Sequence, residues 1–310
     1  MTPETNTLSS ALPNDAAQTA APSRSINELQ RLFWSIRREF WENRSIYIAP
    51  LAVAALIVLA FLYAAIRTPI VNVQVQTPTG DMVMHRMPPI VPYEIAATLI
   101  MGTTFLVAVF YCLDALYSER RDRSILFWKS LPLSDLTTVL SKTIIPIVIL
   151  PAIAFVVVIV TQSLMLLISV LTLHARGLSG TTHLPLLKTA LVLLYHLITM
   201  QALWYAPIYG WLLLVSAWAR RAPLLWAVLP PVALGVLEGI ALHSNHIFEI
   251  LRYRISGPQD TAFTGSHMSI TLAQINPAHF LATPGLWTGL VLALVFIAAA
   301  IQLRHYRNPI

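Results

Sequence analysis

Long runs of apolar residues, separated by short polar segments, dominate the pattern along this chain. A helix rises 1.5 Å per residue, so about 20 apolar residues cross the roughly 30 Å hydrocarbon core of a bilayer. Six runs meet this length, over residues 46–66, 93–117, 143–172, 187–217, 222–242 and 282–303. The pattern predicts an all-α integral membrane protein with six transmembrane helices.

Two of these runs are too long for a straight crossing. The uncharged stretches 143–173 and 189–219 would each extend ~46 Å if fully helical. Proline interrupts helical hydrogen bonding, and Pro146, Pro151 and Pro207 lie within these stretches. We expect both segments to tilt, kink or project from the bilayer.

An amphipathic segment, residues 25–44, precedes the first span. Ser25 and Glu28 fit a capping box, which predicts the start of a helix. The apolar stripe is formed by Leu29, Leu32, Phe33, Ile36 and Phe40, and is flanked by Trp34 and Trp41. The polar residues Arg31, Arg38, Glu39 and Glu42 fall largely off this stripe. The pattern is typical of an interfacial helix on the inner leaflet or against a partner subunit; the alternative is a stiff lead-in to the span.

Residues 1–24, which come before this helix, are polar and rich in Ala, Thr, Ser and Pro. They lack the apolar core of a cleavable signal peptide, so we expect a disordered cytoplasmic tail. The rest of the chain, 25–310, is expected to form a single transmembrane domain.

Composition supports the membrane assignment, and the distribution of charge gives an orientation. The chain is 56% hydrophobic and only 11% charged, with a mean hydropathy of +0.68, whereas soluble domains carry roughly 25% charged residues. Of the 20 Lys and Arg residues, 14 fall on the side of the two termini and six on the other. Both termini are therefore predicted to be cytoplasmic. This asymmetry explains the net charge of +6 without a nucleic-acid partner.

The loop between the second and third spans, residues 118–142, is the most informative stretch. A mixed-charge cluster, 119–123, precedes an apolar patch, 125–128, which Pro132 ends. Ser134 is a predicted N-cap for the next helix, with Asp135 in its first turn. Aromatic residues beside arginine are typical of protein interfaces. The alternative is a positively charged loop whose aromatic residues enter the lipid headgroups.

The run Glu-Arg-Arg-Asp-Arg-Ser-Ile, followed by Leu-Pro-Leu-Ser and then by Ser-Lys at the base of the third span, resembles the cytoplasmic loop of permease subunits of ATP-binding-cassette transporters, in their type-two, export-type membrane family. The resemblance implies that this loop carries a coupling helix that docks on a separate ATP-binding subunit. The residues implied in the contact are Arg121, Asp122, Arg123, Ser124, Ile125, Phe127, Trp128 and Lys129.

The same resemblance implies partners and a location. It implies two ATP-binding subunits, a second permease copy that forms a homodimer with this chain, and the inner membrane of a bacterium. No cofactor is expected in this chain, because ATP and magnesium would be held by the partner subunit. The substrate stays open among peptide, drug, lipid-linked molecule and ion.

The segment between the fifth and sixth spans, 243–283, is expected to lie outside and to contain a short amphipathic or re-entrant helix over 245–255. Most of the nine histidines are scattered on or near this side, so no metal site is expected. Ionisable groups at membrane depth are candidates for a transport path or gate. Those in this chain are Glu238, Glu94 and His196.

Motifs for catalysis are absent from the sequence. No phosphate-binding loop is present, since none of the 11 glycines is followed by lysine, and no zinc-protease motif or nucleophile elbow occurs. We therefore expect a non-enzymatic permease. The alternative function is an ion-coupled secondary transporter that uses Glu238 or His196; a membrane enzyme or scaffold is a third reading, without a supporting constellation.

Overall fold

The computed structural model describes residues 28–67, 73–76, 82–85, 91–122, 134–175, 186–257 and 277–306. Six of its helical segments are long and apolar enough to cross a membrane. They are Ser45–Arg67, Pro92–Arg121, Asp135–Ala175, Leu186–Trp204, Pro223–Leu242 and Pro284–Tyr306. The prediction of a helical protein with six membrane-length segments is confirmed.

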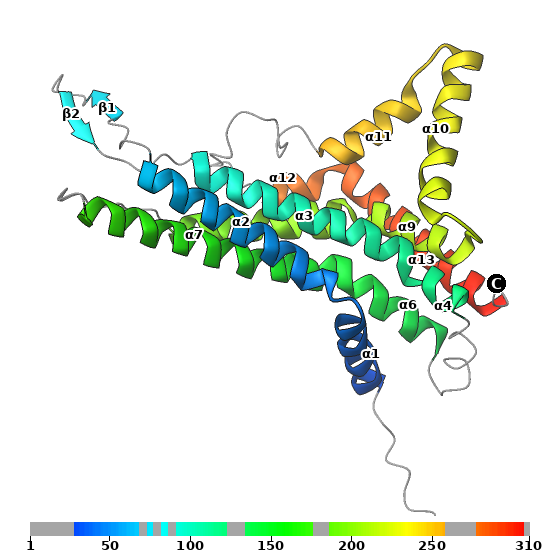
Figure 1. The fold of residues 1–310 in the computed structure, drawn as a ribbon. Coiled ribbons are helices and arrows are strands. Elements are labelled where there is room, and N and C mark those ends of the chain that lie inside the picture. Colours follow the sequence, from blue (N-terminus) through cyan, green and yellow to red (C-terminus); the bar gives the residue numbers. More distant parts are fainter. Residues whose placement is uncertain are drawn as a thin grey trace, which may run out of the picture.

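The first two long helices follow a short helix that points away from them. Helix α1 (Glu28–Glu42) joins α2 (Ser45–Arg67) at a sharp change of direction, so that α1 projects from the base of the bundle (Figure 1). Helix α3 (Val91–Ala115) runs back along α2 and continues, after a turn, into α4 (Tyr117–Arg121).

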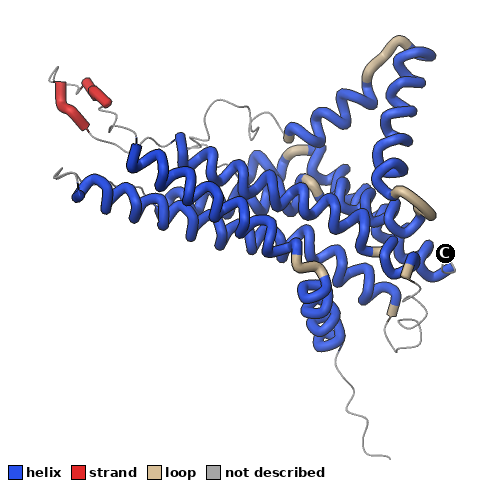
Figure 2. The backbone as a smooth tube through the Cα atoms, in the orientation of Figure 1, coloured by secondary structure: helices blue, strands red, loops and turns tan. Residues whose placement is uncertain are grey.

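A small sheet between α2 and α3 departs from the all-α expectation. Strands β1 (Val73–Gln76) and β2 (Met82–His85) pair antiparallel, with Val73 opposite His85 (Figure 2). Val73 and Val75 alternate with Gln74 and Gln76, the period of two that suits a strand. This hairpin lies at the far end of the bundle from α1 (Figure 1).

The third span is one continuous helical rod. Helix α6 (Asp135–Ile144) leads through the π-helical turn η1 (Ile145–Ile149) into α7 (Leu150–Ala175). The predicted cap is confirmed, because the Ser134 hydroxyl accepts a hydrogen bond from the Thr137 amide. The rod extends ~60 Å, about twice the hydrocarbon thickness, so its α6 end is expected to project beyond the lipid tails.

The fourth apolar stretch is interrupted near Pro207, as its sequence suggests. Helix α8 (Leu186–His196) passes into the π-helix η2 (Leu197–Trp204), and α9 (Ala206–Trp218) begins beyond Tyr205. Pro207 occupies the first turn of α9, where its missing amide hydrogen costs nothing. A π-helical turn in a membrane helix often marks a functional position.

The last third of the chain contains a helix that leaves the bundle. Helix α10 (Pro223–Leu242) and helix α11 (His246–Ser256) form a V that projects from the packed helices (Figure 1). Only 11% of the most apolar window of α10 is buried. The chain then returns through α12 (Pro277–Ala282) and α13 (Pro284–Tyr306).

The core lies where α2, α3, α7 and α9 meet, with α13 packed along α9. Tyr209 and Leu213 of α9 are fully buried there against Ile145 and Cys112. Gly210 allows close approach of α9 and α13, since a Cβ atom at this position would meet the Ala293 carbonyl at 3.2 Å. This packing fixes one end of the bundle, at which α1, α4, α6 and the end of α13 converge.

Candidate functional site

The structure describes both ends of the loop for which partner contact is predicted. Arg121 and Asp122 end α4, are exposed, and form an ion pair with each other at 3.0 Å. The other described end of the loop begins at Ser134. The remaining predicted contact residues lie outside the described residues: Arg123, Ser124, Ile125, Phe127, Trp128 and Lys129.

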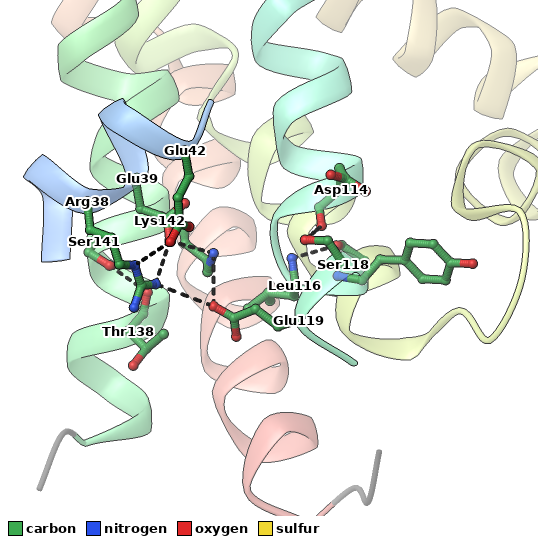
Figure 3. Close-up of polar contacts among 12 residues, drawn as sticks. Arg38, Glu39, Glu42, Asp114, Leu116, Ser118, Glu119, Thr138, Ser141 and Lys142 are labelled. Carbon is green, nitrogen blue, oxygen red and sulfur yellow. Dashed lines mark hydrogen bonds and ion pairs between the residues drawn. The ribbon is translucent and has the colours of Figure 1, made fainter. Parts of the chain in front are cut away.

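Glu39 of α1 is almost completely buried beside this loop. Its carboxylate accepts a hydrogen bond from the Lys142 ammonium at 2.7 Å and from the Arg38 guanidinium at 3.0 Å (Figure 3). The Tyr111 hydroxyl donates to the same carboxylate at 3.1 Å. Lys142 is equally buried at the base of the third span. Because an isolated charge at such depth costs several kcal/mol, the pairing is a condition for burying either group.

Glu119 of α4 is the second buried carboxylate. Lys142 lies 3.1 Å from Glu119 and so bridges the two glutamates, while Arg38 approaches Glu119 at 3.7 Å (Figure 3). One lysine therefore joins α1, α4 and α6. Helix α1 precedes the first span, and helices α4 and α6 flank the predicted coupling loop.

Arg304, near the end of α13, completes the cluster. Its guanidinium forms ion pairs with Glu119 and, at 2.9 Å, with Asp135 in the first turn of α6. The Nδ1 atom of His305 lies 3.3 Å from the other carboxylate oxygen of Asp135. Helix α13 is thereby joined to Asp135, the first residue of the helix that follows the loop.

A second connection fixes α4 against α9. The Arg120 guanidinium donates to the Ser216 and Ala219 carbonyls at 2.6 and 2.7 Å, at the C-terminal end of α9. The Ser216 hydroxyl in turn accepts from the Leu116 and Tyr117 amides at 3.0 and 2.9 Å. A guanidinium at a helix C-terminus satisfies free carbonyls and interacts favourably with the helix dipole.

We call Arg38, Glu39, Glu119, Asp135, Lys142 and Arg304 the basal ion network. Its members come from α1, α4, α6 and α13, and three cations face three carboxylates. The network holds together, at one end of the bundle, both ends of the 118–142 loop and the helices nearest the two termini. Buried ion pairs therefore join the two described ends of this loop to α1 and α13.

Glu42 lies at the margin of the network, outside the spans. Partial burial raises the pKa of the Glu42 carboxyl above its usual range, and Arg38, 3.4 Å away, opposes that rise. Glu42 is about half exposed and makes a single ion pair, in contrast to Glu39. It is therefore a suitable control for the buried glutamate of the same helix.

The residues of the predicted interfacial helix fall on two different faces of α1. Ile36 and Phe40 pack against the core, whereas Phe33 and Trp41 are exposed. The side chain of Leu29 lies outside the described residues. The expected division of this helix into an apolar stripe and a polar remainder is wrong at Glu39, which lies in the buried face.

Glu238, the first candidate for a transport path, caps a helix. Near the end of α10, its carboxylate accepts hydrogen bonds from the His246 and Ile247 amides at 3.0 and 2.8 Å and from the Ser244 hydroxyl at 2.7 Å. These amides belong to the first turn of α11, whose free N–H groups attract a carboxylate. Glu238 thus holds the tip of the V formed by α10 and α11.

The other end of α11 is held by aromatic and arginine contacts. The Arg254 guanidinium lies 4.5 Å from the centre of the Trp204 ring and donates to the Gly285 carbonyl at 2.9 Å. The Trp204 indole donates back to the Arg254 carbonyl at 2.9 Å. Partial burial lowers the pKa of Arg254. Helix α11 is therefore clamped between α10 and the start of α13.

The two remaining candidates lie on other elements. Glu94 is half-buried in the first turn of α3, and His196 is half-buried at the junction of α8 and η2. Glu238, Glu94 and His196 thus belong to three separate helices. Within the described ranges no group of three histidine, cysteine or acidic residues could hold a metal ion.

Sequence reasoning missed the basal ion network. In the sequence pattern, Lys142 and Arg304 are counted among the cations that indicate orientation, Glu119 falls in the mixed-charge cluster 119–123, and Glu39 is placed off the apolar stripe. A usable signal was present: Glu39 falls between Ile36 and Phe40 on the helix, so it shares their face. Carboxylates interleaved with cations at several span ends of one side indicate internal pairing as well as orientation.

Comparisons with known proteins leave the class to be argued from the fold. The chain matches no model of a protein family, no curated protein and no solved structure. Six apolar helices of sufficient length, largely exposed along their apolar faces, indicate a multi-pass membrane protein.

Proposed function

We propose that this chain is the membrane-spanning permease subunit of an ATP-driven exporter of the ATP-binding-cassette class. A separate ATP-binding subunit docks on the 118–142 loop, and two copies of this chain form the substrate path between them. Both termini face the cytoplasm of a bacterial cell, and ATP and magnesium are held by the partner. This chain supplies no catalytic residue.

The observation that supports this proposal most is the basal ion network at the two ends of the loop. Glu119 lies three residues before the exposed Asp122, and Asp135 follows the Ser134 cap on the other side. Both carboxylates are joined to Lys142 or Arg304. A loop anchored in this way can transmit movement, whereas a solvated loop on flexible ends would absorb it.

Burial makes the connection stiff. Breaking one buried ion pair leaves its partner uncompensated and costs about 3–5 kcal/mol. Lys142 and Arg304 are each nearly fully buried, so separating α6 from α4 or α13 requires that cost. The four helices are therefore expected to move as one body when the loop is displaced.

The test is recovery of the ATP-binding subunit with the purified full chain. Phe127→Asp combined with Trp128→Asp should abolish recovery of a phosphate-loop ATPase, identified by mass spectrometry, and the ATPase activity that accompanies it. Arg220→Asp combined with Arg221→Asp, at exposed positions between α9 and α10, should retain both. Undiminished recovery with the Phe127 and Trp128 variant, at normal expression, would reject the docking assignment.

The alternative, an ion-coupled transporter that uses Glu238, receives less support from the geometry. A proton carrier has to exchange its proton with the transport path, whereas the Glu238 carboxylate accepts from two amides and a hydroxyl of the α10–α11 junction. Transport in ATP-depleted vesicles under a proton gradient, lost in Glu238→Gln, would favour the alternative.

A further inference from the structure

Helix α1 has one face that nothing in the described part of the chain covers. Phe33, Trp34 and Trp41 are 61, 58 and 70% exposed, and Arg37 between them is exposed as well. We call these four residues the aromatic face. They recur at a spacing of one, three and four residues, which places them on one side of the helix.

The rotation of α1 about its own axis is fixed by the opposite face. Glu39 is held by Lys142 and Tyr111, and Ile36 and Phe40 pack into the core. The helix cannot turn its aromatic face inward without removing Glu39 from its buried cation. The exposure of Phe33, Trp34 and Trp41 is thus built into the fold.

Arg37 joins the aromatic residues into one surface. Its guanidinium lies 5.2 Å from the centre of the Trp34 ring and 5.8 Å from that of Trp41, within reach of a cation–π interaction with both. The guanidinium carries its N–H donors in a planar fork. Such donors suit the paired oxygens of a phosphate group.

The place of α1 in the molecule favours a lipid surface. The helix turns away from α2 where the first span begins, so it runs across the direction of the bundle (Figures 1 and 2). Exposed Arg44 adds a second positive charge at that junction. Indole rings prefer the depth of the lipid headgroups, and basic side chains beside a span attract anionic lipids.

We infer that the aromatic face of α1 is a docking surface for anionic phospholipid headgroups. Arg37 binds the phosphate, and Trp34 and Trp41 enter the headgroup layer on either side of it. Because the next residue, Arg38, pairs with both Glu39 and Glu119, the lipid is bound one residue away from the basal ion network. This inference needs only the membrane-spanning fold and is independent of an ATP-binding partner.

The experiment measures lipid retention by the purified, delipidated full chain. Native mass spectrometry follows the binding of phosphatidylglycerol and of phosphatidylcholine with identical acyl chains. The unmodified chain should bind phosphatidylglycerol about fivefold more tightly than Arg37→Gln does. Arg221→Gln removes the same charge from another exposed position and should leave the preference unchanged. Arg37→Lys should restore only part of it, since lysine lacks the planar donor fork.

Two results would overturn the inference. Equal binding of phosphatidylglycerol by Arg37→Gln and by the unmodified chain, with both folded by their thermal midpoints, would remove Arg37 from lipid binding. If Trp34→Ala combined with Trp41→Ala left lipid binding intact but abolished recovery of the ATPase subunit, the aromatic face would be a protein interface. Arg37 forms no ion pair among the described residues, so its replacement should not unfold the chain.

Discussion

Glu39 is the buried carboxylate through which α1 is joined to α3 and α6. A lysine, an arginine and a tyrosine hydroxyl converge on its carboxylate, which is only 1% exposed. Such a group stabilises a fold only while its partners are in place, because a buried cation left unpaired is unfavourable. The stability of the base should therefore depend steeply on this one position.

Replacement of Glu39 by glutamine should lower the free energy of unfolding by about 1.5–3 kcal/mol, because buried Lys142 loses its nearer carboxylate and keeps only that of Glu119. Unfolding of the full chain in detergent, followed by circular dichroism during denaturant titration, measures this. Glu42→Gln, on the same helix at a half-exposed position, should change it by less than about 1 kcal/mol. Equal losses in the two variants would contradict the network.

Combining Glu39→Gln with Lys142→Met tests whether the cost arises from the ion pair that Lys142 loses. Removing the buried charge together with its partner should recover part of the loss, since an apolar residue of similar volume can replace a buried ion. The coupling between two contacting positions is expected to exceed about 0.5 kcal/mol. Additive losses would show that Glu39 acts through Arg38 and Tyr111 instead.

Glu238 should behave as a helix cap. Glu238→Gln weakens the hydrogen bonds to the His246 and Ile247 amides, which should destabilise the start of α11. Hydrogen–deuterium exchange should become faster over residues 244–250 and stay unchanged in α3 and α7. Glu249→Gln, an exposed position in the same turn, should not alter exchange. Loss of transport without any change in exchange would point to a proton carrier.

Helix α10 is bounded at both ends by strained backbone. Ala222 and His243, at its two caps, have φ angles of 49° and 52°, and they are the positive-φ residues other than glycine in the described ranges. A left-handed conformation costs a residue with a Cβ atom roughly 1–2 kcal/mol. Two residues with left-handed backbone therefore border α10, of whose most apolar window only 11% is buried.

Ala222→Gly should stabilise the protein by about 0.5–1 kcal/mol, because glycine adopts this conformation without the steric cost and only part of that gain is lost as backbone entropy. The same detergent unfolding assay measures the change. Ala233→Gly, in the middle of α10, should have the opposite sign, at a cost of about 0.5–1 kcal/mol. Destabilisation by both substitutions would mean that the turn at residue 222 is not strained.

At the scale of the whole molecule, the length and the apolar pattern of the runs were sufficient to predict the six membrane-length helices. Apolar runs have few alternatives in lipid, since a spanning backbone has to satisfy its own hydrogen bonds. The Ser134 cap and the interruption near Pro207 followed from local chemistry in the same way. The two strands, Val73–Gln76 and Met82–His85, were not predicted, because each has only four residues and gives a weak pattern beside the long helices.

The buried face of Glu39 could be predicted from its spacing to Ile36, but the ion pairs of the basal ion network could not, because they join distant parts of the sequence. Glu39 and Lys142 are 103 residues apart, and Glu119 and Arg304 are 185 apart. A charge at the end of a span has the same local pattern whether it faces water or another charge. Only the packing of α1, α6 and α13 on one another distinguishes these cases.

Orientation in the membrane belongs to this largest scale and gives the final prediction. The lysine and arginine asymmetry predicts that Asp122 and Tyr306 lie on the cytoplasmic side and Ser256 on the opposite side. All three are exposed, whereas the natural Cys112 is buried. In a Cys112→Ser background, a membrane-impermeant maleimide should label Ser256→Cys in intact cells, and Asp122→Cys and Tyr306→Cys only after permeabilisation.

The ion pairs strengthen this expectation in a way that charge counting alone does not. Arg304 of α13 and Arg38 of α1 both contact Glu119, so the two ends of the described chain lie on one side of the membrane whichever side that is. Asp122→Cys and Tyr306→Cys should therefore always behave alike. Labelling of these two cysteines from opposite sides would contradict the fold. Labelling of both in intact cells would show the reverse orientation, in which a cytoplasmic ATPase could not reach the 118–142 loop.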